Sequence, residues 1–345
     1  MPDYDWSSLE AVIIDRQFNT LRLLRDMLGR IGIRTVHALE DPAAARGLLA
    51  QRLVDVAFID AEGPESAIFP LIRNLRHDSD NRNPYLGVFV TAWHPDNALM
   101  LRTTNAGADD LLSKPLAPST VQERLCALVE GRKPFVVTSD FIGPDRRKAP
   151  RPGAAIPLVE VPNTVKLKAT RQWERVNVAD LLGKANTQIN VQKVLRGAIQ
   201  IGFLLDFALP GLSGAPPERM ALDHVGRIPA VAADVLRRLP DGPVRERCAA
   251  FTTPLLTQLA GVLAADGAPL AAETGTQLRR LALAIIQTVQ PERPLEAAIK
   301  EISDAVSAYR ARLQQITAAR QEKTPPAADL PAADPPAPDP APRTA

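Results

Sequence analysis

Short apolar runs alternate with amphipathic helical patterns over the first third of the chain. In the first helical stretch, Leu21, Leu24, Leu28 and Ile31 recur at the spacing of one helix face, and Gly32 follows as a C-terminal stop. Strands separated by helices are typical of a parallel sheet covered on both faces. The pattern predicts an α/β doubly wound five-stranded parallel sheet, with strands at residues 11–14, 33–39, 54–59, 86–90 and 108–112.

After residue 172 the apolar spacing is helical, with no alternating or short apolar run that predicts a strand. We therefore expect an all-α helical domain, built as a bundle. Its helices are predicted near residues 178–206, 217–239, 243–265, 270–290 and 294–321.

The last predicted helix carries a heptad repeat in which apolar residues step alternately by four and three positions. Such a repeat forms either one wall of a monomeric bundle or a seam between two chains. We favour the seam, and hence a homodimer. The repeat consists of Leu295, Ile299, Ile302, Val306, Tyr309, Leu313 and Ile316.

Proline occurs 32 times, well above its ordinary frequency, and its positions divide the chain. Prolines between about residues 143 and 170 exclude a continuous helix there. A second segment, rich in proline and alanine, holds too little apolar surface to fold. The predicted organisation is an α/β domain at 1–134, an extension and proline-rich linker at 135–172, a helical interaction domain at 173–323 and a disordered tail at 324–345.

The formal net charge is only +2, so the whole chain has no strong field of one sign to attract nucleic acid or acidic lipid. The two cysteines, Cys126 and Cys248, lie far apart, which excludes a disulfide framework and a cysteine zinc site. We expect no stretch to be apolar enough to span a membrane. These features predict a cytoplasmic protein.

Polar residues follow four of the five predicted strands: Asp15, Asp60, Thr91 and Lys114. Ligands of parallel sheets bind at the carboxyl ends of the strands. No serine or cysteine nucleophile with a histidine base stands at these positions, and the glycine-rich motifs of nucleotide sites are absent from the sequence. A carboxylate nucleophile beside a cation suits aspartyl-phosphate chemistry.

The motifs AVIID, VDVAFID, VFVTAW and AGADDLLSKPL, within residues 8–132, together resemble a response-regulator receiver domain of two-component signalling. The resemblance implies that Asp60 accepts phosphate from a histidine kinase. It also implies that Thr91 moves onto the phosphoryl group and that Lys114 neutralises one of its oxygens. In this family Asp15 and Asp60 would serve a Mg²⁺ ion.

Two positions depart from the family pattern. Arg16 stands where a second acid normally serves the metal, so we expect weak Mg²⁺ binding and a guanidinium close enough to pair with a carboxylate of the cleft. Glu62 is either a replacement oxygen ligand or an exposed loop residue. Leu111 replaces the aromatic residue that usually reports activation, so the readout of the signal is expected to differ.

His224, in the sequence HVGRIP, faintly resembles the histidine box of kinase dimerisation helices, although a capping or packing role is the simpler interpretation. The basic residues Arg146, Arg147, Lys148 and Arg151 lack interleaved aromatics and indicate a solvated linker rather than a nucleic-acid arm.

The sequence therefore predicts a signalling protein rather than an enzyme. Its partners would be a histidine kinase or phosphotransfer protein and a downstream protein that contacts the helical domain. One alternative is a phosphorylation-independent scaffold with a degenerate receiver, which Arg16 favours. Another is a fusion to a histidine phosphotransfer bundle, which requires an exposed His224.

Overall fold

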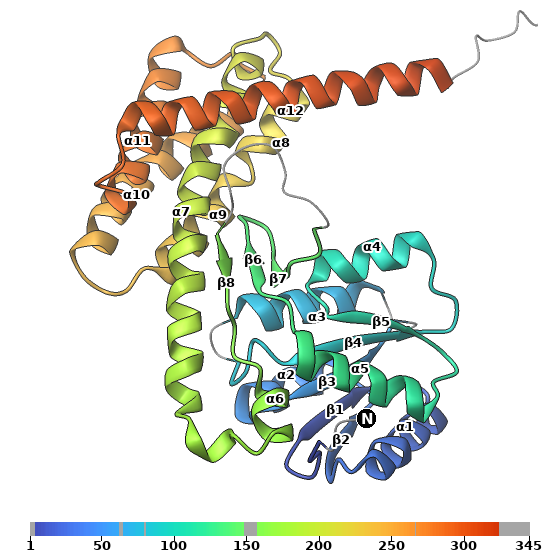
Figure 1. The fold of residues 1–345 in the computed structure, drawn as a ribbon. Helices are drawn as coiled ribbons and strands as arrows, with labels where there is room; N and C mark the ends of the chain where they lie inside the picture. The colour runs from blue at the N-terminus through green and yellow to red at the C-terminus, as the bar shows by residue number, and fades with distance from the viewer. Residues whose placement is uncertain (1–3, 62–64, 79–80, 148–156, 266, 324–345) are drawn as a thin grey trace, which may run out of the picture.

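The structure is a computed structural model in which an α/β body is followed by a largely helical region (Figure 1). The predicted tail at 324–345 lies outside the described part of the chain. The residues that the structure describes are 4–61, 65–78, 81–147, 157–265 and 267–323.

A five-stranded parallel sheet forms the α/β body, as the apolar runs predicted. Its strands are β1 (Glu10–Ile14), β2 (Thr35–Leu39), β3 (Val56–Asp60), β4 (Gly87–Ala92) and β5 (Asp110–Ser113). Its helices are α1 (Phe18–Ile31), α2 (Pro42–Gln51), α3 (Glu65–His77), α4 (Asn97–Ala106) and α5 (Pro118–Gly131). The strand order is β2-β1-β3-β4-β5. Helices α1 and α5 cover one face of the sheet, and α2, α3 and α4 cover the other.

Helix α1 follows the sequence pattern closely. Leu21, Leu24 and Leu28 are buried against the sheet. Gly32 ends the helix with φ at 115°, a left-handed conformation in which its N–H donates to the carbonyl of Leu28 at 3.2 Å. The predicted stripe and the predicted stop are both confirmed.

The segment expected to be an extension and a proline-rich linker has secondary structure in its described parts. Three short strands form an antiparallel sheet in the order β7-β6-β8, and its apolar side chains pack around Tyr85 and Phe135. Lys168 fixes the following helix to the main sheet through the buried Asp55, at 2.7 Å. These elements are β6 (Phe135–Val137), β7 (Ile142–Pro144), β8 (Leu158–Val159), α6 (Thr164–Ala169) and a 3₁₀ turn at Trp173–Arg175.

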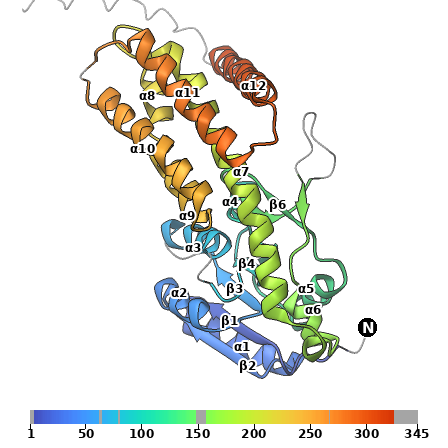
Figure 2. The same cartoon turned by 90° about the vertical axis from the view of Figure 1, so that its left-hand side faces the viewer.

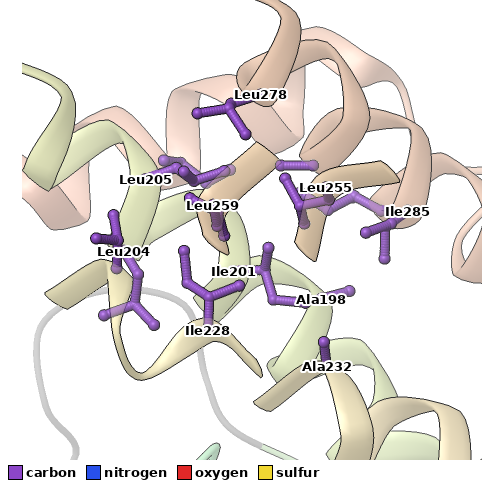
Figure 3. Close-up of a cluster of buried hydrophobic side chains, with 14 of the residues drawn as sticks. Ala198, Ile201, Leu204, Leu205, Ile228, Ala232, Leu255, Leu259, Leu278 and Ile285 are labelled. Atoms are coloured by element: carbon purple, nitrogen blue, oxygen red, sulfur yellow. The ribbon is translucent and has the colours of Figure 1, made fainter. Parts of the chain in front are cut away.

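The helical region has a single apolar core (Figure 3). Its helices are α7 (Val178–Leu212), α8 (Arg219–Val225), α9 (Ile228–Arg238), α10 (Pro243–Ala264), α11 (Ala272–Val289) and α12 (Leu295–Lys323). The predicted helix at 217–239 is two helices, because the chain turns at Gly226 and restarts with Pro229 in the first turn of α9. The predicted helix at 178–206 continues to Leu212, through Pro210.

Helix α7, 35 residues long, is shared by two apolar clusters. In its N-terminal half, Val178, Leu182 and Ile189 pack in the same cluster as Tyr85 and Phe135. Its C-terminal half lies in the core of the helical region, so the helix runs from the α/β body into the bundle (Figure 2).

Contrary to the expectation that no segment qualifies as a membrane span, α7 is long and apolar enough to cross a membrane by length and composition alone. Half of its most apolar window is buried inside the structure. The buried part of α7 packs in both apolar clusters, so its length and composition are weak evidence for a membrane span.

The heptad repeat of α12 is packed only in its middle part. Ile302 and Val306 are buried against the bundle, whereas Leu295, Ile299 and Ile316 are 37%, 41% and 44% exposed. The C-terminal part of the helix projects beyond the bundle (Figure 1). The repeat therefore forms one wall of the bundle within a single chain, and the homodimer stays a prediction.

Candidate functional site

Four polar residues predicted from the strand ends meet at the carboxyl edge of the sheet. Asp60 ends β3 and is the register partner of Thr91 on β4. Lys114, directly after β5, donates from Nζ to Asp60 Oδ1 at 2.7 Å and to Asp15 Oδ2 at 2.9 Å. All four residues are at least 95% buried. The structure thus places a lysine ammonium between two carboxylates in a protected cleft.

Local contacts hold this arrangement in place. The backbone N–H of Gln17 donates to Asp15 Oδ1 at 2.8 Å and orients that carboxylate at the start of α1. The ring of Trp93 lies 5.8 Å from Lys114 Nζ. Burial lowers the pKa of Lys114, but the hydrogen bonds to Asp60 and Asp15 outweigh it, so the pKa lies above its ordinary value. Lys114 therefore stays cationic at neutral pH.

The residues that depart from the family pattern do not join the ion pairs of this site in the part of the chain that the structure describes. Arg16 is exposed, and within the described ranges it forms no ion pair with Asp15 or Asp60, contrary to the pairing expected from the sequence. Leu111 lies in β5 and packs, partly buried, against the core. Glu62 lies outside the described residues.

The carboxylates offer a limited metal site. Among the described residues, no group of three or more His, Cys, Asp or Glu side chains is arranged to hold a metal ion. A Mg²⁺ ion often takes only one or two carboxylates and keeps several waters, so Asp15 and Asp60 fit a hydrated ion. Such an ion would compete with Lys114 for the same oxygens.

His224 does not meet the requirement for phosphotransfer. Its side chain is buried, and Nδ1 donates to the carbonyl of Met220 at 2.7 Å. Its ring packs 4.4 Å from the ring of Phe207 and 5.8 Å from that of Tyr309, centroid to centroid. His224 is a packing residue of the bundle, which removes the support for a histidine phosphotransfer domain.

A buried charged group that the sequence reasoning missed lies at the opposite edge of the sheet. Arg76 donates to Asp109 at 2.8 Å and to the carbonyls of Gly107 and Leu86 at 3.0 and 2.8 Å. Burial lowers the pKa of Arg76 to about 10. A signal was available, because Arg76 falls four residues after Ile72 on the apolar face of α3.

Comparison with known proteins identifies a family over part of the chain. Residues 11–126 match the family model described as response regulator receiver domain. Among solved structures, the chemotaxis protein CheY4 of Vibrio cholerae is 18% identical, with a TM-score of 0.32, over 35% of this chain and 98% of that one. A response regulator from Thermotoga maritima is 24% identical, with a TM-score of 0.31, over 34% and 95%. No curated protein matches the chain. The family match ends before the helical region.

Proposed function

Residues 11–126 form a response regulator receiver domain, and from this we propose that the chain is a two-component signalling protein. In this proposal Asp60 accepts a phosphoryl group from a histidine kinase or phosphotransfer protein in the cytoplasm. The receiver-like domain at 1–134 then controls which downstream protein the helical domain at 173–323 contacts. Asp60 held by Lys114 at the strand edge is the observation that carries the proposal.

The transfer follows from the chemistry of the cleft. A carboxylate oxygen of Asp60 attacks the phosphorus of a phosphohistidine. The P–N bond breaks, and its electron pair stays on the imidazole nitrogen, which takes up a proton. Lys114 then neutralises a phosphoryl oxygen, and the hydroxyl of Thr91, on the strand beside Asp60, donates to another. The added negative charge shifts Thr91 and Lys114 toward the phosphoryl oxygens and changes the face formed by β4 and β5.

Magnesium would lower the charge repulsion between the entering phosphoryl group and the two carboxylates. Asp15 and Asp60 would hold the ion, with Glu62 as a further candidate, and Arg16 in place of an acid weakens the site. Arg16→Asp should therefore bind Mg²⁺ more tightly than wild type and be phosphorylated faster. Calorimetric titration of Mg²⁺ measures the first effect, and equal, tight binding by both proteins would contradict it.

Exposed apolar side chains beside the cleft fit a protein phosphodonor. Phe18 and Leu23 on α1 are 66% and 58% exposed, and Trp93 above Lys114 is 38% exposed. Apolar groups gathered at the mouth of a charged site favour a protein partner over a small anion.

The test is treatment with acetyl phosphate and Mg²⁺, followed by a Phos-tag gel and intact mass spectrometry. Wild type should gain one phosphoryl adduct, which Asp60→Asn abolishes. Asp26→Asn, at an exposed position of α1, is the matched control and should keep it. An adduct that survives in Asp60→Asn would refute the assignment. A wild type that gains none would favour the phosphorylation-independent scaffold.

A further inference from the structure

The receiver and the helical region meet at a polar contact at the end of α3 that is farther along the chain from Asp60. Arg238, at the end of α9, donates from Nη2 to the carbonyl of His77, the last residue of α3, at 2.8 Å. Lys193 of α7 donates to the carbonyl of Ser139, at the tip of the β6–β7 hairpin. These four residues form what we call the junction. It joins two cations of the helical region to two receiver-side carbonyls where α9 approaches α3 (Figure 2).

The cations of the junction are buried and oriented from their own side. Arg238 is 9% exposed, and its Nε donates to Asp234 at 2.9 and 3.0 Å while Nη1 donates to Asn190 at 2.7 Å. Lys193 is 3% exposed, with Asp234 at 3.7 Å. A guanidinium fixed in this way is preorganised to meet the carbonyl of α3.

The contact point on α3 is the carbonyl of its last residue, His77. The last carbonyls of a helix lack partners within the helix and carry partial negative charge, which a cation stabilises. Arg238 supplies that cation at His77. The opposite end of α3 begins five residues after Asp60, and Ile68, Ile72 and Leu75 hold the helix on the sheet. A single helix of about 20 Å, which contains Pro70, therefore links the phosphoacceptor to the junction.

We propose that α3 transmits the state of Asp60 to the helical region, and that phosphorylation and the junction oppose each other. A phosphoryl group on Asp60 stands near the N-terminal end of α3, whose partial positive charge attracts it. The attraction draws α3 toward the cleft and its last carbonyl away from Arg238. This coupling presupposes the phosphorylation of Asp60, and by linkage it acts in both directions.

The first experiment tests the junction without phosphate, by hydrogen exchange of the full chain. In Arg238→Met the amides in the last turn of α3 should exchange about tenfold faster than in wild type, the factor that corresponds to ~1.4 kcal/mol. Arg237→Met is the matched control, because the neighbouring Arg237 is 49% exposed on its side chain and binds Asp234 at 2.6 Å. Equal exchange in Arg238→Met and wild type would overturn the proposal.

The second experiment tests the coupling with beryllofluoride and Mg²⁺, a non-covalent phosphoryl mimic, using the fluorescence of Trp93 beside Lys114. Arg238→Met should bind the mimic about tenfold more tightly than wild type and Arg237→Met, and the mimic should speed exchange at the end of α3 in wild type. Binding of equal strength in all three proteins would refute the coupling and leave Asp60 as the phosphoacceptor. A wild type that neither binds the mimic nor becomes phosphorylated would refute the proposed function as well.

A second variant covers the case in which Arg238→Met does not fold. Asp140, at the hairpin tip, is an exposed side chain that accepts from Gln200 at 3.3 Å and lies 3.7 Å from Arg227. Asp140→Ala removes these contacts, which lie next to the junction residue Ser139, without touching a core. It should shift the affinity for the mimic in the same direction by a smaller factor, and an unchanged affinity would contradict the proposal.

Discussion

Replacing Lys114 by methionine tests whether the candidate site depends on one buried cation. The ammonium lies 2.7 Å from Asp60 Oδ1 and 2.9 Å from Asp15 Oδ2, so these two oxygens are within about 5.6 Å of each other. Methionine fills a similar volume and removes the charge. The variant therefore leaves two buried carboxylates facing each other without the ammonium.

The magnitude follows from that geometry. Two negative charges at this separation repel by about 3 kcal/mol at an effective dielectric constant of 20. Removing one partner of a buried ion pair typically costs ~3–5 kcal/mol. We expect the free energy of unfolding at pH 7 to fall by ~3–5 kcal/mol. Mg²⁺ should restore part of the stability by binding these two carboxylates.

Urea denaturation at pH 7, with and without Mg²⁺, measures these effects. Lys133→Met is the matched control, because Lys133 is an exposed lysine of the same receiver-like domain and its replacement should change stability by less than about 0.5 kcal/mol. A Lys114→Met protein as stable as this control would refute the view that Lys114 neutralises the site.

Three further predictions concern other parts of the chain. Burial, with help from neighbouring cations, lowers the pKa of His77 to about 3 from 6.5, so the unfolded chain binds a proton on this residue more readily and acid favours unfolding. Between pH 7 and 5, wild type should therefore lose about 2 kcal/mol of stability, which His77→Gln should retain. Urea denaturation of both proteins at the two pH values measures this, and an equal loss in both would contradict it. Gly107→Ala should cost about 2 kcal/mol in thermal unfolding, because Gly107 has φ at 94° and its Cβ would lie 2.6 Å from a backbone oxygen; Gly47→Ala, with open space around it, should not. Ile302→Ala should cost ~2–4 kcal/mol, whereas Ile316→Ala should leave the monomer unchanged and weaken any dimer seen by light scattering.

The parallel sheet and the candidate site were predictable because short stretches of sequence indicate both. A buried strand appears as a short apolar run, and the residue after it must lie at the carboxyl edge of the sheet. Asp60 and Lys114 could therefore be placed together although they are far apart in the sequence. Gly32 ended α1 for an equally local reason, its left-handed backbone.

The described parts of the predicted linker could not be predicted, because their partners are distant in sequence. Phe135 and Ile142 lie in runs too short to show a period, and they fold against Tyr85. Helix α7 is predicted near residues 178–206, yet it continues through Pro210 to Leu212, although proline is unfavourable inside a helix. Helix boundaries in the bundle depend on packing, which the sequence does not display.

The sharing of α7 between two cores bears on how this protein can be divided. A cut at residue 172 would remove Val178, Leu182 and Ile189 from the cluster around Tyr85. The truncated receiver would expose the apolar surface around Tyr85, and in the isolated bundle the first half of α7 would lose its apolar contacts. A swap of receivers would succeed only if the recipient supplied the same groove for the first half of α7. The two parts are therefore expected to unfold as one unit.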